Sequence, residues 1–356
     1  MPDSPQDDRK TQHSLTDHRF GALANHEHGE GAFDHDHDED FLPLDSNSLE
    51  SVPLISMGLD VGSSGTQVIF TRLEMRGPGE HRALRRQAKS RETLYMSPVA
   101  LTPLRDDDLI DEDKLWSIVS RAFDAAGLMP DDIETGVVIL TGAAAARANA
   151  QAIAQRMAEE VGELVCAAAG DHMEAMLAAH GSGAVAASAQ GVGRRILNID
   201  IGGATTKFAV ADNGRVTTTA ALKVGGRFMA VDLSNRITRL DPAGACHATQ
   251  NGVEWRKGET ARPEDMARVA QAMARAIVAA LVERPMPAEV ASLFLTDPMG
   301  DLGAIDEVMV SGGVAEYVYG REKRDFGDLG WRLGRAFRKL LDDGALPWPL
   351  AAPGEC

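Results

Sequence analysis

Cysteine is scarce in this sequence of 356 residues: Cys166, Cys246 and Cys356 lie far apart, and no Cys-x-x-Cys pair occurs. This spacing excludes both a disulfide framework and a thiolate metal site, and it suits a reducing compartment. Cys166 stands in the apolar run 164–169, so we expect it to be a small core residue.

Long apolar runs and a basic excess are also lacking. No run reaches the ~18–20 residues needed to cross a bilayer, and the N-terminus lacks the basic-then-apolar layout of a signal peptide. The net charge is −17, which gives no basic patch for nucleic acid. We therefore expect a cytoplasmic protein that binds neither membranes nor nucleic acids. At 38.0 kDa, with 44% hydrophobic residues, two globular domains are expected.

Much of the negative charge lies in residues 1–50, which hold 13 acidic and 3 basic residues and six of the ten histidines. Such a polar segment buries too little apolar surface to offset chain entropy, so we expect a disordered tail. The His and Asp residues in 26–40 suit loose binding of a divalent metal. We favour a solvated extension, because a structural zinc site has ligands flanked by ordered structure.

The most informative feature is a segment that occurs twice, at 55–70 and again at 196–210. Each copy has an apolar strand ending near one aspartate, Asp60 or Asp200, then a turn of Gly, Ser and Thr, then a second apolar strand. Such a turn directs backbone N–H groups and hydroxyls at an anion, while the aspartate can hold a hydrated cation. One copy is weak evidence, but two copies favour a nucleotide held between two facing lobes.

The rest of the chain alternates strands and helices, which is typical of an α/β protein. We expect a first lobe at 51–192 and a second lobe at 193–356. Expected helices are 111–127, the alanine-rich run ending at Val161, 171–180, a long helix after Pro263, and 327–341. Expected strands outside the two hairpins are 136–142, 164–168 and 306–311. Segment 242–260 has few apolar residues and is expected to be a surface insertion, and no closing element is expected before Cys356.

Five features occur in a particular order: the first hairpin, a strand with its helix, a helix bearing Glu174, the second hairpin, and a strand ending in Ser311-Gly-Gly. This order resembles the actin, sugar kinase and heat-shock ATPase superfamily. The resemblance implies a two-lobed actin-like ATPase with ribonuclease H-like domains that binds ATP and Mg²⁺.

The resemblance also implies roles for individual residues. Asp60 and Asp200 would hold Mg²⁺ through water and take part in catalysis, and Glu174 would orient the attacking water. A glutamate on an alanine-rich helix is more often a solvated surface group, so the role of Glu174 depends on its place between the hairpins. Expected nucleotide contacts come from both turns and from the Gly-Gly turn beside adenosine: Gly62, Ser63, Ser64, Thr66, Gly202, Gly203, Thr205, Thr206, Gly312 and Gly313. Lys207 and Lys223 could each neutralise phosphate or lie in solvent.

Within this superfamily, the sequence resembles the EutA family of ethanolamine ammonia-lyase reactivating factors. The resemblance covers about 52–345 and rests on a colinear set of stretches: 58–74, 139–142, 169–174, 197–203, 213–216, 224–227, 311–316 and 326–330. Members of that family continue beyond the point that matches Cys356, so we expect the second lobe to be incomplete at its C-terminus.

This closer resemblance implies an ATP-dependent chaperone in ethanolamine utilisation. It would release damaged cobalamin from ethanolamine ammonia-lyase so that adenosylcobalamin can rebind, with the cobalamin bound by the lyase. The resemblance allows a homo-oligomer and association with a bacterial microcompartment. Two alternatives stay open: a small-molecule kinase of the same superfamily, which needs a general-base aspartate beside a substrate pocket, and an actin-like scaffold whose assembly the nucleotide controls.

Overall fold

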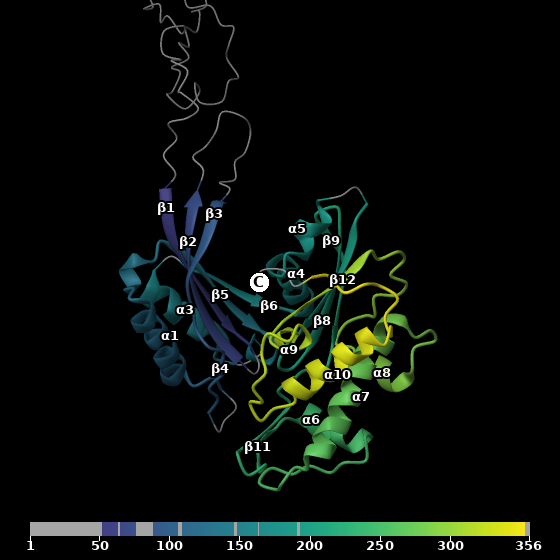
Figure 1. The fold of residues 1–356 in the computed structure, drawn as a ribbon. Coiled ribbons are helices and arrows are strands. Elements are labelled where there is room, and N and C mark those ends of the chain that lie inside the picture. The colour runs from purple at the N-terminus through teal and green to yellow at the C-terminus, as the bar shows by residue number, and fades with distance from the viewer. Residues whose placement is uncertain are drawn as a thin grey trace, which may run out of the picture.

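A computed structural model describes residues 52–62, 65–75, 88–105, 109–145, 148–162, 164–190 and 193–352 of the chain. The expected N-terminal tail, Ser63, Ser64 and Cys356 lie outside these residues. The described chain forms two α/β lobes, each built around its own sheet and its own core (Figure 1). The two-lobed α/β fold expected from the sequence is therefore confirmed.

The first sheet has the strand order β3-β2-β1-β5-β6. It consists of β1 (Val52–Val61), β2 (Gly65–Met75), β3 (Ala88–Met96), β5 (Thr135–Thr141) and β6 (Leu164–Ala169), and the short β4 (Ala100–Leu101) pairs with β2. β2 is antiparallel to both β1 and β3, whereas β5 and β6 continue the sheet in parallel. Early buried positions of β2 alternate along the strand, as expected where one face packs on a core.

The second sheet repeats this topology with the order β12-β7-β8-β9. It consists of β7 (Arg195–Ile201), β8 (Thr206–Asp212), β9 (Arg215–Leu222) and β12 (Glu307–Ser311). β7 and β8 form the second hairpin, and β12 joins β7 in parallel as β5 joins β1. β8 is buried at six consecutive positions, which indicates that both faces of the strand are covered.

Beyond β12 the chain adds a short stretch of parallel backbone pairing. The Val308 amide donates to the carbonyl of Pro349 over 2.8 Å, and the Ala351 amide donates to the carbonyl of Val308 over 2.8 Å. These residues occupy the place that β6 takes beside β5 in the first sheet. The sequence did not predict this return of residues 349–351 to the edge of the sheet.

Helices cover both sheets. The first lobe contains α1 (Glu112–Ala126), the 3₁₀ turn η2 (Pro130–Asp132), α2 (Gly142–Ala145) and α3 (Ala150–Val161). The helices of the second half are α4 (Asp171–Gly181), α5 (Ala184–Ser188), α6 (Pro242–Gln250), α7 (Pro263–Val282), α8 (Ala288–Ala291), α9 (Ala315–Val318) and α10 (Gly330–Asp342). A small hairpin of β10 (Met229–Val231) and β11 (Ile237–Leu240) precedes α6.

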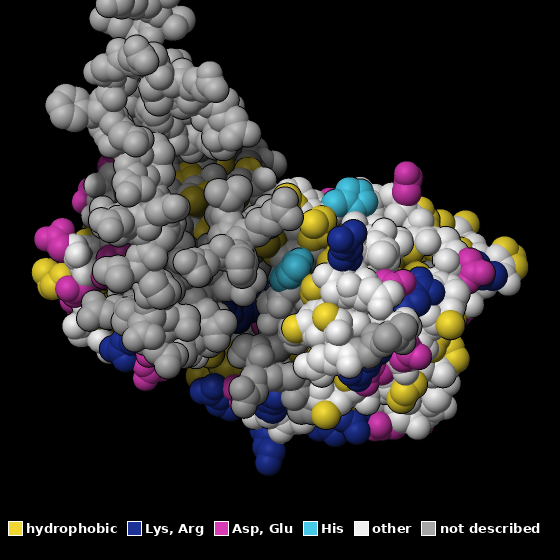
Figure 2. Space-filling view, turned by 90° about the horizontal axis from the view of Figure 1, so that it is seen from above, with side chains coloured by type: hydrophobic (Ala, Val, Ile, Leu, Met, Phe, Trp, Pro, Cys, Tyr) yellow, Lys and Arg dark blue, Asp and Glu magenta, His cyan; other side chains and the backbone are white. Residues whose placement is uncertain are grey.

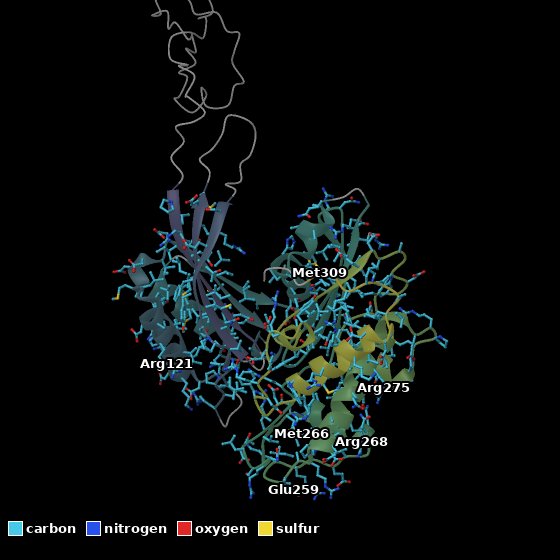
Figure 3. All side chains as sticks on the ribbon, in the orientation of Figure 1. Arg121, Glu259, Met266, Arg268, Arg275 and Met309 are labelled. Atoms are coloured by element: carbon cyan, nitrogen blue, oxygen red, sulfur yellow. The ribbon has the colours of Figure 1, made fainter. Side chains whose placement is uncertain are left out.

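Local sequence explains where the predicted helices begin and end. The Asp111 side chain accepts a hydrogen bond from the Lys114 amide and caps α1, which ends at Gly127 in the left-handed conformation. Pro263 starts α7, where its missing N–H has no helical partner to lose. Met266 of α7 is buried, whereas Arg268 on the same helix is exposed (Figure 3). These two helices are confirmed as predicted.

The chain crosses to the second lobe earlier than expected. Both α4 and α5 pack against β7, β8 and β9, and the His172 ring shares a 2.8 Å hydrogen bond with the Thr219 hydroxyl. Ala179 and Val185 form a small core with Ala209 and Ala211 of β8. The crossing therefore falls near Gly170, before the boundary expected at residue 192. This places the N-terminal turn of α4 where the lobes meet.

Two local expectations were wrong. Segment 242–260 contains α6, and Ala248, Val253 and Trp255 belong to the core of the second lobe. A few apolar residues are enough to attach this segment to the core, because small residues of α6 such as Gly244 allow close packing against Phe228. Cys166 is exposed, because β6 is the last strand at its edge of the described sheet; its Sγ donates to the Ala154 carbonyl over 3.1 Å.

The described helices and one face of the molecule bear on the expected partners. None of its helices is both long and apolar enough to cross a bilayer. Viewed from above in Figure 2, acidic and basic side chains are scattered over the second lobe.

Candidate functional site

The turns of the two hairpins have the same length and closure. The Gly62 amide donates to the carbonyl of Gly65 over 2.9 Å, and the Gly202 amide donates to that of Thr205 over 2.9 Å. In register, Asp60 lies opposite Gln67 in one hairpin, and Asp200 lies opposite Lys207 in the other. The repeat seen in the sequence is therefore a repeat of backbone geometry, and it presents one aspartate at each turn.

The second turn has unused backbone donors. Its carbonyls are occupied: Gly202 accepts from the Gly226 amide over 2.9 Å, and Gly203 accepts from the Arg227 amide over 2.7 Å. Within the described ranges, the amides of Gly203, Ala204 and Thr205 have no hydrogen-bond acceptor. Consecutive unpaired N–H groups in a turn are a common way to bind a phosphate oxygen.

Three carboxylates from separate elements meet where the lobes face each other. Asp60 comes from the end of β1, Asp200 from the end of β7, and Glu174 from the first turn of α4. They are close enough that the negative charges of Glu174 and Asp200 both raise the pKa of Asp60. All three residues that the sequence proposed as catalytic are thus brought together.

Desolvation raises the pKa of each of these carboxyls. The Asp60 side chain is exposed, but many protein atoms lie around it. The desolvation that they cause, together with the charges of the neighbouring carboxylates, raises the pKa of Asp60 to about 7. Burial also raises the pKa of Asp200. The Ser311 hydroxyl donates a 2.8 Å hydrogen bond to Oδ2, which lowers this pKa but does not offset the effect of burial. The junction therefore holds more negative charge than it can stabilise alone, and a cation bound there would be favoured.

Lys207 partly compensates this charge, and its role could not be decided from the sequence. Its side chain is 1% exposed; Nζ lies 2.5 Å from Asp171 Oδ1 and 3.0 Å from Glu174 Oε2. Burial raises the pKa of Glu174, while the Lys207 charge lowers it. Lys223, by contrast, is exposed. The signal that distinguishes Lys207 was present in the repeat, since the first hairpin has Gln67 at the same position.

Glu174 is held in place by this ion pair. Its side chain is 25% exposed, and Oε2 accepts no hydrogen bond of good geometry. This oxygen is buried against the Lys207 ammonium, 3.0 Å away. The arrangement therefore differs from that of a solvated surface glutamate.

Two of the expected phosphate contacts have a structural role instead. The side chains of Thr66 and Thr206 are fully buried. The Thr206 hydroxyl donates to the Val224 carbonyl over 2.8 Å, and the Thr66 hydroxyl lies 3.1 Å from the Thr102 hydroxyl. Each is the first inward-facing residue after its turn, so its hydroxyl contact holds the turn against the rest of the lobe. Ser63 and Ser64 lie outside the described residues.

The two glycines after β12 differ in their surroundings. Gly312 has φ +82°, and a Cβ there would lie 2.6 Å from the Ile201 carbonyl and 3.0 Å from Asp200 Oδ1. Gly313 is exposed and faces open space. Gly312 is therefore required for β12 to pack against the Asp200 strand, whereas Gly313 leaves a bare backbone surface beside the site.

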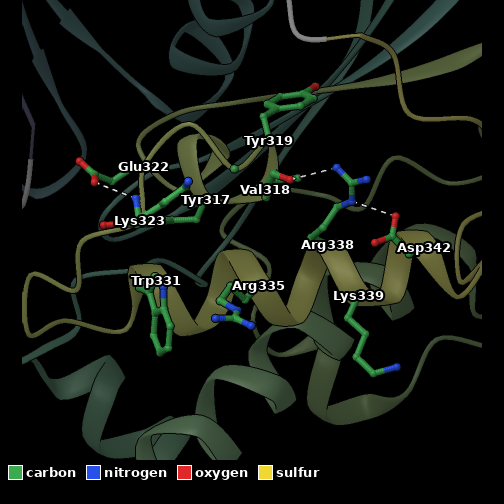
Figure 4. A pocket seen from close by; sticks show the side chains of 11 residues that line it. Tyr317, Val318, Tyr319, Glu322, Lys323, Trp331, Arg335, Arg338, Lys339 and Asp342 are labelled. Carbon is green, nitrogen blue, oxygen red and sulfur yellow. Dashed lines mark hydrogen bonds and ion pairs between the residues drawn. The ribbon is translucent and has the colours of Figure 1, made fainter.

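A separate pocket of about 620 Å³ lies between the segment 317–323 and α10 (Figure 4). Its walls include Tyr317, Trp331, Lys323 and Arg335. Neither of these two cations has a carboxylate partner among the side chains the structure describes, although Arg335 lies over the Trp331 ring at 4.9 Å. None of the residues predicted from the sequence lines this pocket, but its mix of rings and cations suits an anion with a planar group.

Direct metal coordination is not prepared in the described residues, since no group of three or more His, Cys, Asp or Glu side chains there has a suitable arrangement. The tail histidines, which we expect to belong to a solvated extension, lie outside the described residues.

Comparison with known families tests the resemblance seen in the sequence. The family described as ethanolamine utilisation protein EutA matches residues 52–347. The chain belongs to the EutA family. Two curated relatives of this family are ethanolamine ammonia-lyase reactivases EutA. The protein from Salmonella typhimurium (strain LT2) is 32% identical over 290 residues, covering 80% of this chain and 62% of the relative. That from Escherichia coli (strain K12) is 32% identical over 288 residues, covering 80% and 61%.

The chain thus spans less than two thirds of the length of these EutA relatives. Similar solved structures include a PilM–PilN type IV pilus biogenesis complex, with TM-score 0.46, 14% identity, and coverage of 84% of this chain and 88% of that chain. An Aquifex aeolicus PPX-GPPA enzyme has TM-score 0.44, 13% identity, and coverage of 82% and 93%. Both scores are low.

The raised pKa of Asp60 predicts a pH effect on stability. In the unfolded chain this carboxyl has its ordinary pKa near 3.8, against about 7 in the fold. Between these values the folded state binds more protons, so Asp60 lowers stability as pH rises from about 4 to 7. We expect Asp60→Asn to raise the melting temperature at pH 8 and to change it little at pH 4. Equal shifts at both pH values in thermal melts would contradict this assignment.

Proposed function

We propose that this protein is an ATP-dependent reactivating factor for ethanolamine ammonia-lyase. It would bind Mg-ATP between its lobes and use hydrolysis to release damaged cobalamin from the lyase, so that adenosylcobalamin can rebind. The observation that carries this proposal is the convergence of Asp60, Asp200 and Glu174 beside two matched turns. Membership of the EutA family supports the choice of partner.

The residues at the junction fit magnesium and a triphosphate. Asp60 and Asp200 would hold the metal through water, and the free amides of 203–205 would hold phosphate oxygens. Gly62 and Gly202 set the shape of the two turns, and the open surface of Gly313 would lie against adenosine. Mg-ATP supplies, when bound, the phosphoanhydride bond whose hydrolysis drives the cycle.

The catalytic work assigned to this chain is to position water. Glu174, in the first turn of α4, would accept a hydrogen bond from the attacking water. Lys207 holds that carboxylate in place, and its charge lowers the pKa that burial raises. Water held in line by a fixed carboxylate is the positioning effect on which phosphoryl transfer depends.

Work on a partner requires that ligand binding change the arrangement of the lobes. The site draws groups from both, since Asp60 belongs to the first sheet and Asp200 to the second. A ligand that contacts both lobes stabilises the closed arrangement by its differential affinity. Closure of the lobes would change the affinity of the bound lyase for its cobalamin.

The test uses the purified 356-residue chain with ATP, Mg²⁺ and ethanolamine ammonia-lyase that has been inactivated by damage to its bound cobalamin. We expect ATP turnover to rise when inactivated lyase is added, together with recovery of lyase activity once adenosylcobalamin is supplied. Phosphate transfer to a small metabolite would instead support a kinase, and sedimentable filaments a scaffold. The absence of any ATP hydrolysis with or without lyase would sink the proposal.

The adjacent glycines provide a matched pair of variants. Gly313→Ala adds a methyl group in open space, so we expect an unchanged melting temperature and roughly tenfold weaker ATP binding, equivalent to ~1.4 kcal/mol. Gly312→Ala forces a left-handed residue against the Ile201 carbonyl and should cost about 1–3 kcal/mol of stability. Calorimetric titration and thermal melts measure both. Normal ATP affinity in Gly313→Ala would remove adenosine from this surface.

A further inference from the structure

Arg227 is fastened by its backbone to the second turn. It follows Gly225 and Gly226 in the segment between β9 and β10. The amides of Gly226 and Arg227 donate to the carbonyls of Gly202 and Gly203. A Cβ on Gly225 would lie 2.5 Å from the Gly203 carbonyl, so only glycine allows this close approach. The start of the Arg227 side chain is thereby fixed relative to the turn that bears the free amides.

The guanidinium group reaches across to the first turn. A Cβ at Gly65 would lie 3.5 Å from Arg227 Nη1, which puts this cation against the backbone of the first hairpin. The side chain is 24% exposed, so it keeps some contact with solvent. Arg227 therefore contacts the second turn through its backbone and the first turn through its side chain.

Asp328 holds this guanidinium and connects it to α10. Arg227 Nε donates to Asp328 Oδ2 over 3.1 Å, and Asp328 Oδ1 accepts from the Gly330 amide at the start of α10 over 2.8 Å. The Leu329 amide also donates to the Gly226 carbonyl over 2.9 Å. Asp328 is 7% exposed, so its charge depends on this arginine. A movement of the guanidinium would therefore displace Asp328 and change its hydrogen bond to the N-terminus of α10.

The charge balance of the junction makes this cation important. Asp60, Asp200, Glu174 and Asp171 supply four carboxylates, and the Lys207 ammonium is already engaged by two of them. A triphosphate adds further negative charge. Arg227 is a cation beside both turns that retains donors not used by its carboxylate partner, and the guanidinium fork matches a phosphate in shape.

We propose that Arg227 recognises the terminal phosphate of a nucleoside triphosphate and thereby distinguishes the triphosphate from the diphosphate. Its guanidinium donates to that phosphate between the turns, and Asp328 passes the change to α10. This inference rests on the proposed nucleotide site. It makes Arg227 the residue through which hydrolysis loosens the contact between the lobes.

The test compares Mg-ATP and Mg-ADP affinities by calorimetric titration of the full chain. We expect the wild type to prefer ATP, Arg227→Ala to lose at least tenfold in ATP affinity with little change for ADP, and Arg227→Lys to lie between them. Arg215→Ala is the matched control, because Arg215 is exposed at the opposite end of β9. An unchanged ratio of ATP to ADP affinity in Arg227→Ala overturns the inference while leaving the nucleotide site standing.

Two further outcomes are decisive. If the wild type binds neither nucleotide, the proposed function fails and the role of Arg227 fails with it. If Arg227→Ala does not fold, because Asp328 is left buried without its partner, the double variant Arg227→Met/Asp328→Asn removes both charges and allows the same comparison. Equal ATP preference in that folded double variant would also overturn the inference.

Discussion

Lys207→Met is expected to destabilise the protein severely and to abolish nucleotide hydrolysis. The substitution leaves Asp171 and Glu174 partly buried without their shared cation. Breaking a buried pair by removing one partner typically costs about 3–5 kcal/mol, because the remaining charge is uncompensated. Chemical denaturation would measure the loss of stability, and phosphate release would measure turnover.

Lys223→Met is the matched control, since this second lysine of the same hairpin region is exposed. It should unfold like the wild type. The triple variant Lys207→Met/Asp171→Asn/Glu174→Gln removes all three charges and should recover much of the lost stability without recovering hydrolysis. A Lys207→Met protein as stable as the wild type would show that the buried ion pair contributes nothing.

Asp200→Asn is expected to reduce Mg-ATP hydrolysis by roughly 10–100-fold or more while the fold is kept, as for groups that orient a metal. The amide can still accept the hydrogen bond that the Ser311 hydroxyl donates, so local packing is preserved. Loss of the negative charge removes the partner of the hydrated cation. Asparagine is a cleaner change than alanine, which would also remove the acceptor of the Ser311 bond.

Two measurements distinguish this effect from general damage. The hydrolysis rate titrated against Mg²⁺ should need far more metal in Asp200→Asn, whereas the melting temperature should fall little. Asp212→Asn, at the far end of β8 beside Arg195, is the control and should behave as the wild type. Wild-type turnover in Asp200→Asn would be incompatible with a metal role for this residue.

Local patterns predicted most of the regular structure because short-range physics governs it. The cap at Asp111, the stop at Gly127 and Pro263 at a helix start are effects within a few residues. The pairing of Asp60 with Asp200 could also be anticipated, because a duplicated hairpin implies duplicated lobes. The proximity of Glu174 followed from a family resemblance rather than from its own helix.

Other features depend on which surfaces meet, and no local pattern contains that information. Thr66 and Thr206 read as phosphate contacts in a turn, but both face inward and fasten it. Cys166 lies in an apolar run, yet its strand is at an edge. The importance of Arg227 appears only when Asp328, a hundred residues later, is brought beside it.

Sequence alone determined the α/β character of this protein, its repeated acidic turns and the family to which it belongs, because these depend on periodicity and on the order of motifs. Tertiary structure decided which charges share the junction, that Lys207 is buried between two carboxylates while Lys223 is exposed, and that α4 packs on the second sheet. The physical reason is that a charge takes its energy from what surrounds it in space, and neighbours in space are set by packing across the whole chain.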